Sequence, residues 1–197
     1  LRLSDGIATR AGGGVAFGPS WMCLAYKNAS AVHGRQPKAI FVEKGDEGMN
    51  NASIIQNCEV DPDLDIQSGG MSEMDLQSPE LGGALYSLNG YDFQVGGMEI
   101  TNCKAWRGGA MFVSMPAKAE VSRVIFHEND AREYGGACEV EEGARLVLDH
   151  TLFTGNKARS GGALAVVTQR SETTTISMSQ SELRGNRALA GGGVYLT

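Results

Sequence analysis

The side chains best suited to acid–base chemistry are two histidines that each have an aspartate close by in the sequence. His150 directly follows Asp149, and His127 comes shortly before Asp130. A carboxylate beside an imidazole can form a general base when the fold brings the two together. The two pairs occupy different places in the repeat described below, which favours solvated surface residues. No serine or cysteine lies in a nucleophile motif such as G-x-S-x-G. The sequence therefore predicts no catalytic residue.

Four cysteines, Cys23, Cys58, Cys103 and Cys138, are spaced irregularly and form no C-x-x-C pair, so a zinc site is not expected. Cys58 and Cys103 share the context Ile-x-Asn-Cys. If these two segments lie side by side as strands, the two cysteines are neighbours at the strand spacing of roughly 4.8 Å, which is inside the Cα–Cα range for a disulfide. The alternative is a pair of small buried side chains that fill a turn. A Cys58–Cys103 disulfide is therefore one of two interpretations.

An acidic stretch, residues 59–81, contains no lysine or arginine. Its segment from Asp61 to Asp65 has the D-x-D-x-D spacing of a calcium loop. Ile66 stands where that loop needs glycine, however, and Ser72 stands where it needs glutamate. A solvated acidic loop is favoured over a calcium site, and neither a metal nor a cofactor is expected.

Two sequons, at Asn28 and Asn51, are candidates for N-glycosylation. Both lie near predicted loops, where a glycan could be accommodated in a secreted protein.

A repeat organises the chain and must position all of these residues. Gly-Gly-Ala begins at Gly82, Gly108, Gly135 and Gly161, a Gly-Gly-Gly variant begins at Gly191, and successive starts are 26 to 30 residues apart. A constant period predicts one structural unit per repeat, stacked so that neighbours bury each other's apolar faces.

One repeat, residues 135–160, contains three short β-rich pieces at 137–140, 145–148 and 151–153, separated by turn residues. The repeat is too short for a strand–helix–strand crossover. The sequence therefore predicts an all-β protein, a parallel β-helix with three short strands per coil. We expect one domain, 1–197: the end of a partial coil at 1–11, an irregular coil at 12–81 with insertions at about 18–37 and 59–81, and regular coils at 82–197.

Alternation after each Gly-Gly predicts which side chains face the core. Two apolar columns should point inward: Val15, Leu85, Met111, Cys138, Leu164 and Val194, and Phe17, Ser87, Val113, Val140, Val166 and Leu196. The column between them should point outward: Ala16, Tyr86, Phe112, Glu139, Ala165 and Tyr195. Glu139 is its only ionisable carboxylate, so the face offers no acid–base pair, although its aromatic rings could stack on sugars.

An asparagine recurs five or six residues before each following Gly-Gly. Asparagine tolerates left-handed backbone better than most residues, and its amide can bond to the asparagine above and below. We expect a structural ladder of Asn57, Asn102, Asn129, Asn156 and Asn186.

Composition restricts the partners. The net charge is −6 and the pI is near 5.1, which argues against nucleic-acid binding. No apolar run is long enough to span a bilayer, and residues 1–20 do not read as a signal peptide.

The motifs together resemble a known repeat type. Gly-Gly-Ala followed by an aliphatic residue, with Phe-x-x-Asn at Phe126–Asn129 and Phe153–Asn156, resembles the repeats of chlamydial polymorphic outer membrane proteins and related surface proteins of algae and protists. Leu183–Asn186 is a near match, whereas Glu99 departs from the pattern. The resemblance covers 82–197 well and 1–81 only in outline. It implies a right-handed parallel β-helix of the pectin-lyase-like kind, extracellular and associated with adhesion, and it carries over no catalytic residue.

We therefore expect an extracellular or cell-surface structural or adhesive β-solenoid. It should either assemble end to end or form part of a longer surface protein, with surface glycans as secondary partners. The alternative is a carbohydrate-binding protein or a carbohydrate-active enzyme. Two or more carboxylates clustered on one outer face would favour the enzyme.

Overall fold

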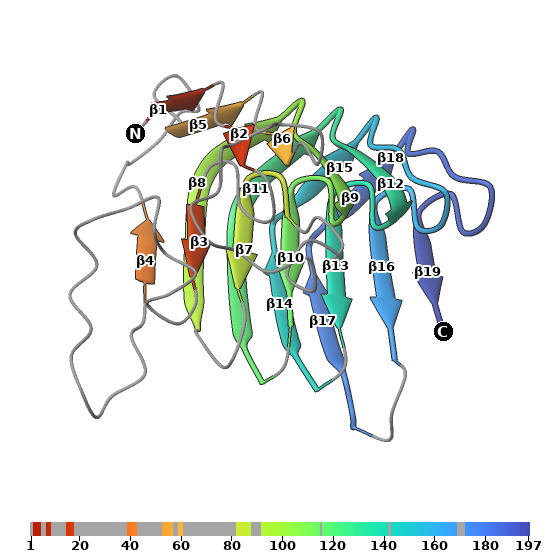
Figure 1. The fold of residues 1–197 in the computed structure, drawn as a ribbon. Coiled ribbons are helices and arrows are strands. Elements are labelled where there is room, and N and C mark those ends of the chain that lie inside the picture. Colours follow the sequence, from red (N-terminus) through yellow and green to blue (C-terminus); the bar gives the residue numbers. More distant parts are fainter. Residues whose placement is uncertain are drawn as a thin grey trace, which may run out of the picture.

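The fold is a parallel β-solenoid of about four turns, with no helix among the residues that the structure describes (Figure 1). The structure is a computed structural model. It describes residues 82–87, 92–114, 116–141, 143–168 and 172–197, together with the backbone of six short strands before them. The all-β, coil-by-coil architecture predicted from the Gly-Gly repeat is confirmed.

Three sheets run along the solenoid, and we call them the front, top and rear sheets. The six-stranded front sheet contains β3 (Val15–Phe17), β7 (Leu85–Ser87), β10 (Met111–Val113), β13 (Cys138–Glu141), β16 (Leu164–Val167) and β19 (Val194–Leu196). The four-stranded top sheet contains β2 (Ile7–Ala8), β6 (Glu59–Val60), β9 (Lys104–Arg107) and β12 (Asp130–Tyr134). The nine-stranded rear sheet contains β1 (Arg2–Ser4), β4 (Ala39–Val42), β5 (Ser53–Gln56), β8 (Phe93–Thr101), β11 (Lys118–His127), β14 (Arg145–Asp149), β15 (Leu152–Thr154), β17 (Thr175–Ser179) and β18 (Glu182–Arg184). The strands β1, β5, β15 and β18 of the rear sheet lie along the top in Figure 1.

Each coil places its residues directly against those of the next, because the named strand pairs are parallel and in register. In the front sheet Met111 pairs with Cys138, which in turn pairs with Leu164. In the rear sheet Phe126 pairs with Phe153, and their rings stack with centroids 4.9 Å apart. The predicted inward columns of the middle coils are buried in one apolar core. Burial of each large side chain stabilises the fold by ~1.5–3 kcal/mol.

Backbone with positive φ turns each corner of the coil. The front corner has the first glycine of each Gly-Gly: Gly82, Gly108, Gly135, Gly161 and Gly191. The corner before the top sheet has Asn102, Glu128, Gly155 and Gly185, and the corner within the rear sheet has Gly97, Arg123, His150 and Gln180. Left-handed backbone costs a residue with a Cβ roughly 1–2 kcal/mol, so the corners that carry Arg, His or Glu are strained.

The second glycine of each Gly-Gly has a different role, which is to let neighbouring coils approach. A Cβ added to Gly109 would lie 2.2 Å from the carbonyl oxygen of Gly136, and the same distance separates a Cβ on Gly162 from the oxygen of Gly192. Both contacts are with backbone, so nothing can move aside. The double glycine thus combines a conformational requirement with a steric one.

The last coil is the least buried part of the described chain. Val194 is 41% exposed and Leu196 is 70% exposed, whereas Leu164, which occupies the place of Val194 one coil earlier, is 2% exposed. The strands β17, β18 and β19 pair on one side only among the described residues.

Candidate functional site

Asparagine side chains form a continuous hydrogen-bonded column at the corner before the top sheet. The Oδ1 atom of Asn156 accepts from the backbone N–H and the Nδ2 atom of Asn129, both at 3.0 Å. Asn186 accepts in the same way from Asn156, at 3.0 and 2.9 Å. The amides of Asn129 and Asn156 also donate to backbone carbonyl oxygens, at Ile100 and Phe126. These amides saturate buried backbone groups, which is a structural role.

The expectation for Asn102 is wrong, and so is the conformational reason given for the ladder. Asn102 is exposed with φ 53°, and Cys103 takes the ladder position, because its backbone N–H donates to Asn129 Oδ1 at 3.0 Å. Asn129, Asn156 and Asn186 do not have positive φ; the left-handed residue is the one before, such as Glu128 or Gly155. Asparagine is therefore selected here for its hydrogen-bonding amide rather than for its backbone.

Several predicted positions lie outside the described residues. Asn57 of the ladder, the sequons at Asn28 and Asn51, and Cys58 belong to this group. Cys103 is fully buried, with its Sγ atom 3.4 Å from the carbonyl oxygen of Thr101. The Cys58–Cys103 disulfide and the glycosylation of the two sequons stay predictions.

The outer column of the front sheet is not an open face. Its members do lie outside the core cluster, but Tyr86 is 3% exposed, and Phe112 and Glu139 are fully buried. Arg107, at the end of β9, contributes to this burial, since its guanidinium lies 5.4 Å from the centre of the Phe112 ring and bonds to Glu139. Tyr86 and Phe112 stack at 5.7 Å, so the predicted aromatic stripe exists as a buried pair.

Arg107 donates hydrogen bonds to two carboxylates, those of Glu139 and Glu141. Its Nε atom donates to Glu139 Oε2 at 3.1 Å, and Nη2 donates to the other oxygen of Glu139. Its Nη1 atom donates to Glu141 Oε1 at 3.0 Å, and the hydroxyl of Ser114 donates to Glu141 Oε2 at 3.0 Å. The guanidinium also lies 5.6 Å from the centre of the Tyr134 ring. We call Arg107, Glu139 and Glu141 the arginine–glutamate cluster.

Burial controls the protonation of this cluster. Desolvation raises the pKa of Glu139 to about 8, since the attraction of Arg107 offsets only part of the cost and Glu141 adds repulsion. Burial also raises the pKa of Tyr86 to about 12, with a further contribution from the charge of Glu141. Two carboxylates share one guanidinium, so the cluster carries an excess negative charge unless it takes up a proton.

Sequence reasoning identified Glu139 but missed Arg107 and Glu141. Glu141 could have been found, because positions 139 and 141 lie on the same face of a strand. Arg107 carried no such signal, since it comes from a neighbouring sheet and a different coil. Two carboxylates on one outer face meet the criterion set for an enzyme, but Glu139 has no exposed surface, and both of its oxygens bond to Arg107.

The two histidine–aspartate combinations do not come together in one site. His150 Nδ1 lies 2.8 Å from Asp149 Oδ2, on the exposed surface. Ser179 donates to Asp149 at 2.6 Å, so the hydroxyl bonds to the carboxylate and not to the imidazole. His127 lies 3.6 Å from Glu128, while Asp130 pairs with Lys157. Neither arrangement brings a base to a nucleophile.

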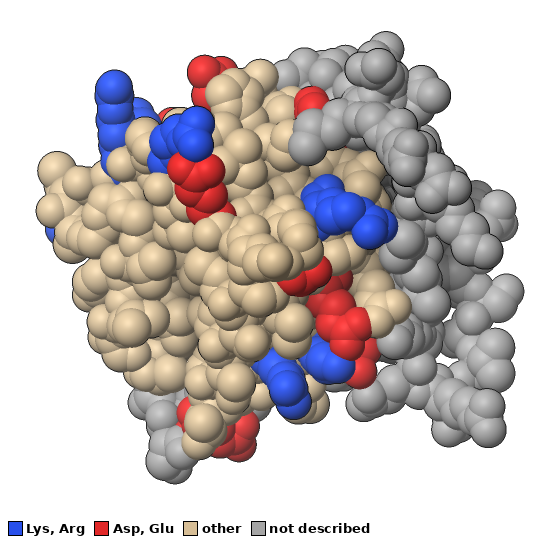
Figure 2. Space-filling model, turned by 180° about the vertical axis from the view of Figure 1, so that it is seen from behind, with Lys and Arg blue, Asp and Glu red and all other residues tan. Residues whose placement is uncertain are grey.

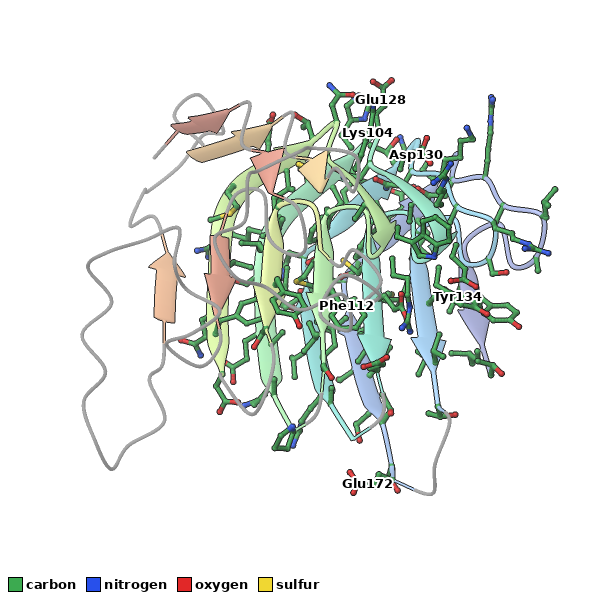
Figure 3. The ribbon with its side chains drawn as sticks, viewed as in Figure 1. Lys104, Phe112, Glu128, Asp130, Tyr134 and Glu172 are labelled. Carbon is green, nitrogen blue, oxygen red and sulfur yellow. The ribbon has the colours of Figure 1, made fainter. Side chains whose placement is uncertain are left out.

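A shallow cleft of about 290 Å³ lies where the top and front sheets meet near the last coil. Its lining residues are Glu133, Tyr134, Arg159, Ser160 and Tyr195. Figure 3 shows Tyr134 on the front side of the molecule, to the C-terminal side of Phe112, while Lys104 and Asp130 lie along the top.

Charge on the opposite side is sparse. The rear view in Figure 2 shows a mainly uncharged surface on which blue and red side chains mostly lie next to one another. Within the described part of the chain, no group of three or more His, Cys, Asp or Glu side chains is placed to hold a metal ion. The described residues also form no helix that is long and apolar enough to cross a membrane.

Comparison of the chain with protein-family models, with curated proteins and with solved structures found no match.

Proposed function

We propose that this chain is a structural and adhesive β-solenoid of an extracellular surface, to which further coils of the same kind add at the last coil. The observation that carries the proposal is the uncovered apolar surface of that coil. Leu189 is 89% exposed and Leu196 is 70% exposed. A strand edge that also exposes apolar side chains favours the addition of another strand.

Gly192 supports coil addition in particular. It is the second glycine of its triplet, and an added Cβ would meet only the oxygen of Asn186, at an ordinary 3.6 Å. In the earlier coils the same position is pressed against the next coil. An added coil would therefore approach Gly192 as closely as the backbone of Gly192 approaches Gly162.

The repeat motifs support the same proposal by resemblance. Gly-Gly-Ala and Phe-x-x-Asn resemble the repeats of chlamydial polymorphic outer membrane proteins, whose association with adhesion and right-handed coils we extend to this chain. Self-association end to end, which stacks one copy on another in an open head-to-tail contact, would produce filaments.

The test is electron microscopy with measurement of the mass in solution, on the unchanged protein and on Gly192→Ala. We expect filaments or a concentration-dependent mass for the unchanged protein. The substitution should abolish both without lowering the midpoint of thermal unfolding, because the added methyl group meets open space within one copy. A monomeric unchanged protein at all concentrations would contradict self-assembly.

A carbohydrate-active enzyme is the second candidate, and the arginine–glutamate cluster is the observation that favours it. Retaining glycosidases use two carboxyl groups about 5–5.5 Å apart. Polysaccharide cleavage that is lost in both Glu139→Gln and Glu141→Gln would support this candidate. The full burial of Glu139 argues against it, since a substrate could not reach this carboxyl group.

A further inference from the structure

We propose that the cleft beside Tyr134 binds an acidic sugar, meaning a pyranose ring of a glycan that carries a carboxylate or a sulfate. The cleft is formed within one copy of the chain, so ligand binding can be measured on a copy that does not assemble.

The cleft is built across successive coils rather than by one loop. Tyr134 ends β12 in the top sheet, Ser160 forms a parallel bridge with it one coil later, and Tyr195 lies in the middle of β19. The rings of Tyr134 and Tyr195 stack with centroids 6.1 Å apart and an interplanar angle of 22°. Ala165 pairs with Tyr195 in the adjacent strand, and its small, buried side chain leaves room for this contact.

The ring of Tyr134 already has the Arg107 guanidinium 5.6 Å from its centre and stacks on Tyr195, so Tyr195 is the ring left to contact a ligand. Both rings are intermediate in exposure, unlike the buried pair of Tyr86 and Phe112. An aromatic ring with a hydroxyl provides an apolar face together with a polar end. A sugar has the matching surface, with C–H groups on its ring face and hydroxyls at its edge.

The charges around the cleft select the kind of sugar. Asp130 is paired with Lys157 at 3.6 Å, and Glu133 accepts a hydrogen bond from Trp106 Nε1 at 3.0 Å. Arg159 is exposed, lines the cleft, and makes no ion pair within the described part of the chain. The cation at this cleft that remains available is thus an arginine, whose planar guanidinium matches a carboxylate or a sulfate.

The neighbouring surface adds to the attraction of an anion. Arg132 lies 4.9 Å from the centre of the Trp106 ring, and Arg187 is exposed one coil beyond Lys157. These cations lie on a protein with a net charge of −6. These exposed cations would attract an acidic glycan to this corner and oppose the repulsion from Glu133, the carboxylate that lines the cleft.

The experiment is calorimetric titration of the monomeric Gly192→Ala protein with three probes. They are a hyaluronan hexasaccharide, which carries carboxylates, a dextran sulfate oligosaccharide, and the uncharged dextran oligosaccharide of the same length. Use of the monomer separates this test from the test of assembly. We expect binding of at least one acidic probe, weakened by added salt, and no binding of dextran.

Matched variants assign the binding to the cleft. Arg159→Gln and Tyr195→Ala should each weaken binding by tenfold or more. Arg184→Gln removes another exposed arginine, which pairs with Glu182 on the rear sheet, and should leave binding unchanged. The acidic probe that binds identifies the anionic group. No binding of either acidic probe, equal binding of dextran, or an equal loss in Arg159→Gln and Arg184→Gln would overturn the proposal.

Discussion

Glu139 follows the in-and-out alternation of its strand, yet its side chain is buried rather than exposed. Alternation along the strand places it on the face away from the core, as expected. The carboxyl group is nevertheless fully buried, and this burial raises its pKa to about 8, although Arg107 opposes the rise. An ionisable residue on an outer strand face is therefore exposed only if no neighbouring sheet reaches over it.

This shift makes the stability of the protein depend on pH. The folded state holds a proton on Glu139 that the unfolded state releases above its ordinary pKa of 4.5. The free energy of unfolding should therefore fall as the pH rises from about 4.5 to about 8, by at most about 1.4 kcal/mol per pH unit. Urea unfolding at pH 5, 6.5 and 8 measures the slope.

Glu139→Gln should remove most of that slope, because the amide cannot titrate. Glu182→Gln is the control, since Glu182 is exposed and pairs with Arg184. Equal slopes for the unchanged protein and Glu139→Gln would show that the carboxyl group is ionised in the folded state.

At the scale of the element, the three corner columns decide how one strand leads to the next. The sequence revealed one of them, because glycine occupies it in every coil. The rear corner was invisible, since Arg123, His150 and Gln180 hold the same left-handed backbone without glycine. The sequence therefore indicates a left-handed backbone only at positions where glycine, the residue best suited to positive φ, is used.

Replacement of Arg123 by glycine should therefore stabilise the fold. Its φ is 52°, so glycine relieves a strain of roughly 1–2 kcal/mol and costs roughly 0.5–1 kcal/mol in entropy. We expect a net gain of about 0.5 kcal/mol in chemical denaturation. Arg145→Gly, at an exposed strand position with ordinary φ, should lower stability by about 1 kcal/mol. A loss in both variants would contradict the assignment of strain to this corner.

Within the candidate site, the asparagine ladder could be predicted from the sequence only in part. Asn129, Asn156 and Asn186 were recognised by their period, whereas Asn102 kept nearly the same period and belongs to the corner instead. Irregular spacing within the top sheet, where β12 is bulged against β9 between Ala131 and Tyr134, makes a count of residues ambiguous by one. The cleft at Tyr134 was not predicted at all, because its walls come from separate coils.

Across the whole molecule, stability is transmitted from coil to coil, since each repeat contacts only its neighbours. The coil that contains β17, β18 and β19 has a neighbour on one side only among the described residues, and it is mostly exposed. Amide hydrogen exchange should therefore be slowest in β11 and β14 and much faster in β17 and β18, because the last coil can open without the others. Uniform protection across these strands would indicate that the terminal coil is covered in solution.

The connection between the front and rear sheets differs from coil to coil without disturbing the columns. Residues 114–117 join β10 to β11, whereas residues 168–174 join β16 to β17, and the paired strands stay in register. The length of this connection can thus vary without effect on the rest of the fold, whereas a Gly-Gly corner covered by the next coil, as at Gly109 and Gly162, has no room for one methyl group. The fold should therefore tolerate insertions at this connection. Foreign segments inserted into the front-to-rear connections of successive coils, of which residues 114–117 and 168–174 are two, should be presented in a row along one edge on a frame that does not need to be redesigned.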